Sequence, residues 1–176
     1  MIPTRRLILL LVVLALPLLL AEVVPVVADI ALLLNLGLLA AVTADLLISA
    51  RPSQLQVRRE VSDVLSLGDD NPARLIVTNR SSRPIQLTVH DDSGPLCRTD
   101  RLPQTQMAPV DRSIEYAYSI RPLRRGRSSL QAVHLRFPTR LGLWNRHHVR
   151  ELPAEIRIYP NIRAVYRWFR GHGRLF

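Results

Sequence analysis

The stretch LILLLVVLALPLLLAEVVPVVADIALLLNLGLLAAVTADLLI (residues 7–48) is almost wholly apolar, and it decides how the rest of the chain is placed. A helix rises about 1.5 Å per residue, so residues 7–27 and 30–48 each approach the roughly 30 Å thickness of a bilayer core. Two prolines and one acidic residue interrupt the end of the first segment, which places a turn around residues 22–29. The sequence therefore predicts a transmembrane helical hairpin over residues 1–50.

Arginines flank the two apolar segments on both outer sides. Arg5 and Arg6 precede the first segment, and Arg51, Arg58 and Arg59 follow the second. The short turn between the segments carries acidic residues and no arginine. Because positively charged flanks stay on the cytoplasmic side, we expect an inner-membrane protein with two spans and both termini in the cytoplasm.

A cleavable signal peptide is the alternative interpretation of the first apolar segment. Arg5 and Arg6 would form its charged region, and Val26-Val27-Ala28 is a weak small-residue cleavage site. Even with cleavage, the second span would leave residue 51 onward in the cytoplasm.

Small and polar residues interrupt the second apolar segment. Gly37, Ala41 and Ala44 share one helix face, and such a face permits close approach of another helix. We expect it to pack against the first span, with homo-dimerisation as the alternative. Asp45 would cost roughly 3 kcal/mol at mid-bilayer, but it lies near the end of the segment, where the headgroup region can hydrate it.

The charge of the chain lies after the hairpin. Residues 51–176 hold 22 of the 24 basic residues, all of them arginine, against 11 of the 14 acidic residues. The absence of lysine excludes Schiff-base and P-loop lysine chemistry. The arginines are dispersed among acids, so an anionic membrane surface explains them better than a nucleic acid does. The single cysteine, Cys97, permits no internal disulfide, as expected in a reducing compartment.

From residue 51 to residue 160 the pattern changes to alternation of apolar and polar residues, which is typical of half-buried strands. The alternating segments are residues 55–57, 85–89, 114–120, 133–137 and 156–158. Turn-forming residues separate them at 68–72, 79–84, 91–95 and 125–126. About seven short strands without a convincing helix predict an all-β, immunoglobulin-like antiparallel sandwich over residues 51–160, with a barrel as the alternative.

Residues 161–176 form a basic, aromatic tail with four arginines and no acidic residue. We interpret the tail as a linker whose packing partner is missing from the chain. A segment that lies in the membrane interface is the alternative.

Two residue clusters suggest metal chemistry at first sight. His147 and His148 are adjacent, but neighbours on a strand point to opposite faces, and no carboxylate pair or cysteine lies near them in sequence. Asp91-Asp92-Ser93 is explained better as a turn that closes the preceding strand. No Ser/His/Asp set, P-loop or Gly-rich dinucleotide motif is present. The sequence therefore predicts no catalytic, cofactor or metal site, and a non-enzymatic protein.

Arg124, Arg125 and Arg127 surround Gly126 between two predicted strands. We expect these arginines to lie at an exposed hairpin tip, where they are candidates for contact with a protein partner.

Residues 120–162 resemble the bacterial family called "domain of unknown function fifty-eight". Three segments carry the resemblance: Pro-Leu-Arg-Arg-Gly at 122–126, Gly-Leu-Trp at 142–144 and Tyr-Pro-Asn at 159–161. In that family a two-helix anchor and a β-sandwich precede a von Willebrand factor A-like domain, and members are linked with MoxR-type AAA+ ATPases. This chain stops at Phe176, before the stretches that define the A-like domain, so no metal-dependent binding of that domain can be assigned to residues here.

The resemblance implies a membrane-anchored scaffold or protein-interaction module at the cytoplasmic face, without cofactors. Its expected partners are membrane lipid and an AAA+ ATPase or A-domain protein, and it is a candidate homo-oligomer. An outward-facing structural or adhesive sandwich is the alternative function.

Overall fold

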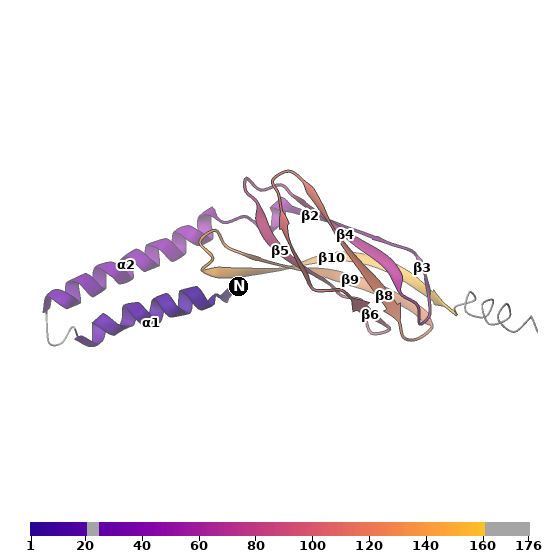
Figure 1. Cartoon of the computed structure of the whole chain (residues 1–176), viewed down its shortest axis with the longest axis horizontal. Helices are drawn as coiled ribbons and strands as arrows, with labels where there is room; N and C mark the ends of the chain where they lie inside the picture. Colours follow the sequence, from indigo (N-terminus) through magenta and orange to yellow (C-terminus); the bar gives the residue numbers. More distant parts are fainter. Residues whose placement is uncertain (21–24, 161–176) are drawn as a thin grey trace, which may run out of the picture.

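Two antiparallel helices project from one end of a β-sandwich in the computed structural model, which describes residues 1–20 and 25–160 (Figure 1). Helix α1 spans Arg5–Leu20 and helix α2 spans Pro25–Ile48. They lie side by side, and the Asn35 side chain of α2 donates a 3.3 Å hydrogen bond to the backbone oxygen of Leu14 in α1. The predicted helical hairpin is therefore present as a structural unit.

The bounds of the helices differ from the expected ones. Helix α2 begins at Pro25 rather than at residue 30, so Asp29 lies in the helix and not in a turn. Proline is suited to the first position of a helix, because its fixed φ is already helical and its missing N–H has no partner there. Residues 22–24, the rest of the expected turn, lie outside the described residues.

Among the described residues, the helical stretch Val26–Gln54 alone is long and apolar enough to cross a membrane. Its mean hydropathy is 2.2. Helix α1 is also strongly apolar, but it has only 16 residues within the described part of the chain. One N-terminal apolar helix that can act as an anchor is thus present, and a second span stays a prediction.

The described residues form two packed β-sheets. The four-stranded sheet has the order β2 (Leu55–Val61), β4 (Asn71–Asn79), β8 (Ser113–Pro122) and β6 (Cys97–Asp100). The six-stranded sheet has the order β1 (Ile2–Pro3), β10 (Trp144–Tyr159), β9 (Gly126–Pro138), β5 (Ile85–Asp91) and β7 (Gln104–Ala108), with β3 (Val64–Ser66) also beside β10. All pairs are antiparallel except β3–β10, which confirms the antiparallel sandwich.

From β2 to β9 the chain changes sheet at every connection that the structure describes. Strands β9 and β10 are the consecutive pair that remains in one sheet. The connection at Arg124 and Arg125 therefore joins β8 in one sheet to β9 in the other, and the expected hairpin tip is wrong. A turn signal in the sequence marks where a strand ends, but it carries no information about which sheet the next strand joins.

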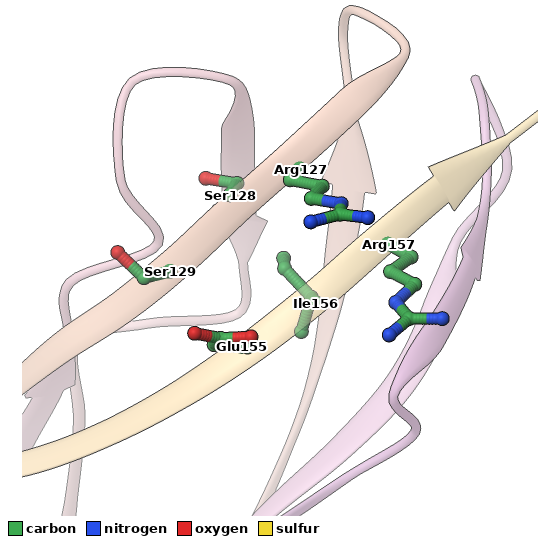
Figure 2. A pocket seen from close by; sticks show the side chains of 6 residues that line it. All are labelled: Arg127, Ser128, Ser129, Glu155, Ile156 and Arg157. Carbon is green, nitrogen blue, oxygen red and sulfur yellow. The ribbon is translucent and has the colours of Figure 1, made fainter.

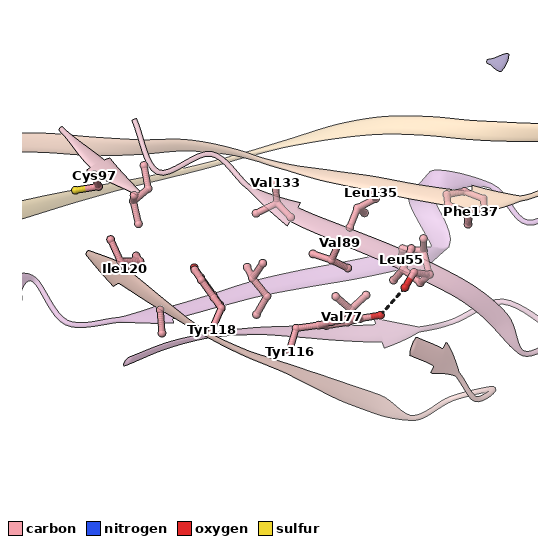
Figure 3. Packing of buried hydrophobic residues seen from close by; sticks show 14 of the residues in the cluster. Leu55, Val77, Val89, Cys97, Tyr116, Tyr118, Ile120, Val133, Leu135 and Phe137 are labelled. Atoms are coloured by element: carbon pink, nitrogen blue, oxygen red, sulfur yellow. Dashed lines mark hydrogen bonds between the residues drawn. The ribbon is translucent and has the colours of Figure 1, made fainter. Parts of the chain in front are cut away.

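The core lies between the two sheets, where the apolar side of the alternation is buried as predicted (Figure 3). Leu87, Val89 and Leu135 face Val77 and Tyr116 of the other sheet, and all five side chains are fully buried. The Tyr116 hydroxyl donates a 3.0 Å hydrogen bond to the backbone oxygen of Leu87, so this ring fills the core without an unpaired polar atom. Burial of a side chain of this size stabilises the fold by about 1.5–3 kcal/mol.

A buried ion pair crosses the same core. Arg59 of β2 donates to both carboxylate oxygens of Asp91 in β5, at 3.1 and 2.5 Å, and the two side chains are 3% and 0% exposed. Tyr118 of β8 donates its hydroxyl to Asp91, and Arg59 also donates to the backbone oxygens of Leu130 and Leu152. Burial, followed by the charge of Asp91, raises the pKa of Tyr118 well above its usual range. The network joins the two sheets, and Asp91 belongs to strand β5 rather than to the expected turn.

The first residues of the chain also belong to the sandwich. Strand β1 pairs Ile2 with Asn145 and Pro3 with Trp144, beside the turn between β9 and β10. Both ends of the helical hairpin are therefore attached to the same part of the six-stranded sheet.

Candidate functional site

The turn between β9 and β10 (residues 139–143) is held by a buried carboxylate at the end of helix α2. Asp45 is 0% exposed. Its oxygens accept hydrogen bonds from the Thr139 hydroxyl at 2.6 Å, from the Leu141 amide at 2.7 Å and from the Leu143 amide at 3.4 Å. Hydrogen bonds to an ionised group are about twice as strong as neutral ones. We call this contact between the helices and the turn the junction.

A buried arginine holds the junction from the sheet side. Arg146 of β10 donates to the backbone oxygens of Leu46, at 2.6 Å, and Ala50, at 3.1 Å, at the end of α2. The last carbonyls of a helix have no partner within it, and a cation there also complements the helix dipole. The Arg140 amide donates to the hydroxyl of Ser49 at 2.8 Å. The sandwich is therefore hydrogen-bonded to the end of helix α2 and not tethered to it by a free linker.

Helix α1 contacts the same turn. The Thr4 hydroxyl donates to the backbone oxygens of Gly142 and Leu143, at 2.7 and 3.0 Å, and its amide also donates to Leu143. Gly142 has a φ of 71°, a backbone conformation that residues other than glycine rarely adopt. This conformation turns the chain sharply between the two helices. The Gly-Leu-Trp segment of the family resemblance is therefore a structural element of the junction.

The structure corrects the expected surroundings of the Asp45 carboxylate. Headgroup hydration was expected for this carboxylate, but the protein itself supplies its hydrogen-bond donors, from residues 94 to 98 positions away in the sequence. A residue that would be costly in lipid is thus stabilised by burial against backbone amides.

The small-residue face of α2 does not lie where we expected it. Gly37 and Ala44 are exposed, and a Cβ on Gly37 would meet no atom within 4 Å, whereas Ala41 is half-buried. Helix α1 instead packs on the face that contains Ala31, which is fully buried, and Asn35. The small-residue face therefore does not pack on the first helix as we expected, because the Asn35 hydrogen bond sets a different rotation of α2. Homo-dimerisation through that face stays a prediction.

The candidate partner-contact arginines lie at the end of the sandwich farthest from the helices (Figure 1). Arg124 and Arg125 are exposed in the connection before β9, and Arg127 is exposed on β9 itself. Arg157 of β10 lies directly opposite Arg127 in the register. We call Arg124, Arg125, Arg127 and Arg157 the distal arginine surface. Since β9 has 13 residues, this surface is roughly 40 Å from the junction.

The distal arginine surface borders a shallow cavity of about 260 Å³, lined by Arg127, Arg157, Glu155, Ser128, Ser129 and Ile156 (Figure 2). None of its four arginines takes part in an ion pair within the described residues. Like charges directly opposite each other on neighbouring strands are destabilising. The Arg127–Arg157 pair is therefore unfavourable in the isolated chain and would be relieved by an anionic group bound between the strands.

The two adjacent histidines lie on β10, with His147 exposed and His148 half-buried, as expected for neighbours on a strand. His147 shares a cavity of about 370 Å³ with His90 and His134 on the outer face of the six-stranded sheet. The rings of His90 and His134 are 6.1 Å apart. In the described residues no three His, Cys, Asp or Glu side chains come close enough to bind a metal ion together. We assign this cavity no chemistry.

Cys97 is buried at the edge of the core, and burial raises the pKa of its thiol. The thiolate is the reactive form, so burial makes this thiol less reactive than a free cysteine. The basic aromatic tail expected at 161–176 lies outside the described residues.

The comparisons with known proteins show the fold and no family. No protein-family model and no curated protein matches the chain. Its sandwich is similar to a C-terminal portion of alpha-2-macroglobulin from Escherichia coli, with 16% identity, a TM-score of 0.50, and coverage of 60% of this chain and 16% of that one. A protein of unknown function from Porphyromonas gingivalis aligns at 17% identity with a TM-score of 0.46, over 63% of this chain and 50% of that one. The chain thus spans half or less of these two proteins, and the first likeness supports the β-sandwich alone.

Proposed function

We propose that the chain is a non-enzymatic, membrane-anchored interaction module that presents the distal arginine surface to an acidic protein partner. The observation that carries this proposal is the pair Arg127–Arg157, two like charges opposite each other that form no ion pair within the described residues, at the end of the sandwich farthest from the helices. The junction supports the proposal, because Asp45 and Arg146 hold that surface at a fixed distance from the membrane. The resemblance found in the sequence suggests a MoxR-type AAA+ ATPase or an A-domain protein as the partner.

Two membrane spans and a cytoplasmic sandwich belong to the same proposal. The arginines on both outer sides of the hairpin support this orientation. The alternative, an outward-facing structural or adhesive sandwich, requires the opposite one.

A topology reporter separates these two orientations. With alkaline phosphatase or green fluorescent protein fused after Phe176, we expect fluorescence and no phosphatase activity, because the phosphatase folds only outside the cytoplasm. The same fusions placed after residue 22 should give the opposite result if both apolar segments span the membrane. Phosphatase activity from the fusion after Phe176 would contradict the cytoplasmic placement.

Reversal of one charge on the distal arginine surface is expected to stabilise the isolated chain and to weaken capture of the partner. Arg127→Glu places a carboxylate opposite Arg157, so the isolated chain should become more stable by about 0.5 kcal/mol. Capture of the protein partner should fall by tenfold or more, because the anionic group now meets a like charge. Denaturant unfolding measures the first effect, and quantitative pull-down from detergent-solubilised membranes measures the second.

The matched control is Arg112→Glu, which makes the same charge change at an exposed arginine between β7 and β8. It should leave partner capture unchanged. Equal capture by Arg127→Glu and the unmodified chain would refute the proposed surface, as would repeated failure to enrich any AAA+ ATPase or A-domain protein.

A further inference from the structure

A second set of arginines surrounds a cavity at the junction, at the other end of the sandwich. The cavity measures about 440 Å³ and lies between the start of α1 and the turn between β9 and β10. Its polar lining consists of Thr4, Arg5, Arg6, Gln86, Thr139 and Arg140. Among the described residues, no acidic side chain lines it.

The positive charge of this cavity is not compensated within the described residues. Arg5, Arg6 and Arg140 form no ion pair there. A Cβ on Gly142 would come within 3.4 Å of Arg6 Nη1, so this guanidinium lies against the backbone of the turn. The neighbouring carboxylate, Asp45, already accepts hydrogen bonds from the turn.

Arg83 lines a different cavity, but it lies close enough to Arg140 and to Asp45 for both charges to act on it. Burial, and next the charge of Arg140, lower the pKa of Arg83. The Nε atom of Arg83 is buried without a hydrogen-bond partner in the described structure. Arginines that crowd one another in this way are stabilised when an anion binds among them.

The position of the cavity indicates which anion is available. Apolar side chains cover the helices immediately beyond it, with Leu9 63% and Leu33 68% exposed. Such surfaces are stable in the hydrocarbon region of a bilayer, and Arg5 and Arg6 stand where α1 leaves that region. The cavity therefore lies at the level of the phospholipid headgroups.

We infer that this cavity binds the phosphate group of an anionic phospholipid of the surrounding membrane. Guanidinium groups bind phosphate oxygens through paired hydrogen bonds. A headgroup that carries no cation of its own also avoids repulsion from Arg5, Arg6 and Arg140. The inference rests on the membrane insertion that the proposed function also requires, and it is independent of the protein partner.

The test uses the full chain purified in dodecyl maltoside. Native mass spectrometry counts the lipid bound during titration with phosphatidylglycerol or phosphatidylcholine. We expect phosphatidylglycerol to bind about tenfold more tightly than phosphatidylcholine. The triple variant Arg5→Gln, Arg6→Gln, Arg140→Gln should lose about 100-fold in phosphatidylglycerol affinity, because each arginine near an anionic headgroup contributes roughly fivefold. The single variant Arg140→Gln, at an exposed position, should lose about fivefold and keep the circular dichroism of the unmodified chain.

The matched control removes the same number of charges at the distal end, in Arg124→Gln, Arg125→Gln, Arg127→Gln. It should keep phosphatidylglycerol binding within twofold. Equal losses in both triple variants, or unchanged binding in the junction variants, would overturn the inference. Displacement of the lipid by millimolar inorganic phosphate would also overturn it, since the site would then take free phosphate. Capture of the protein partner tests the distal arginine surface alone. The lipid-binding measurements can therefore be interpreted even if the proposed partner binding fails.

Discussion

Replacement of Asp45 by alanine is expected to release the turn between β9 and β10 from the anchor helix. The Leu141 and Leu143 amides would lose their acceptor, and the buried Thr139 hydroxyl would keep only the backbone oxygen of Trp144. Loss of hydrogen bonds to a buried charge, with the partners left unsatisfied, costs about 3 kcal/mol or more. Hydrogen exchange at the Leu141 and Leu143 amides should therefore accelerate by roughly 100-fold in the detergent-solubilised chain.

The exchange experiment has internal and matched controls. Amides of Leu87 and Leu135, in the core, should keep their protection, because the sandwich does not depend on the junction for its packing. Asp29→Ala removes an exposed carboxylate from the same helix and should change neither region. Unchanged protection at Leu141 in Asp45→Ala would show that the carboxylate does not hold the turn.

The second large effect is expected at the ion pair in the core. Arg59→Met should destabilise the chain by about 3–5 kcal/mol, since Asp91 would remain as a buried charge without its cation. Asp91→Leu should cost a similar amount, because Arg59 is then unpaired. The double variant Arg59→Met, Asp91→Leu should recover most of the loss, to within about 1–2 kcal/mol of the unmodified chain, as apolar replacements of buried pairs often do.

Urea unfolding of the full chain, followed by far-ultraviolet circular dichroism, measures these differences. The double-mutant cycle gives the coupling between the two side chains independently of their packing. Arg58→Met, on the exposed face of the same strand, is the control, and we expect it within about 0.5 kcal/mol of the unmodified chain. Additive losses in the double variant would contradict the interpretation.

The sequence contains enough information to locate β2, β5, β8, β9 and β10 and part of the core network, whereas β3, β4, β6 and β7 were not expected. Alternation at Leu55, Val57 and Arg59 places Arg59 on the inward face, and Asp91 follows Leu87 and Val89 at the same spacing. Two residues of opposite charge on inward positions are a signal of a buried pair, although we interpreted Asp91 as part of a turn.

The junction and the distal pair could not be found in this way. The partners of Asp45 in the turn lie at least 94 positions away, so no local pattern marks them. The register that places Arg127 opposite Arg157 includes an irregularity between Glu151 and Ala154, which period-two alternation cannot predict. The exposure of Arg124, Arg125 and Arg127 was predictable from turn chemistry, whereas the sheet that each strand joins was not.

The long pairing of β9 with β10 has a mechanical consequence. Apart from the irregularity between Glu151 and Ala154, it extends from Asn145–Pro138 beside the junction to Ile158–Gly126 beside the distal arginine surface. A pulling force along the strands, between that far end and the junction, is carried by the covalent backbone of the two strands, whereas a sideways force is resisted by the hydrogen bonds between them. The β9–β10 hairpin is therefore stiff along the line from the distal arginine surface to the junction, where Asp45 and Arg146 connect it to α2.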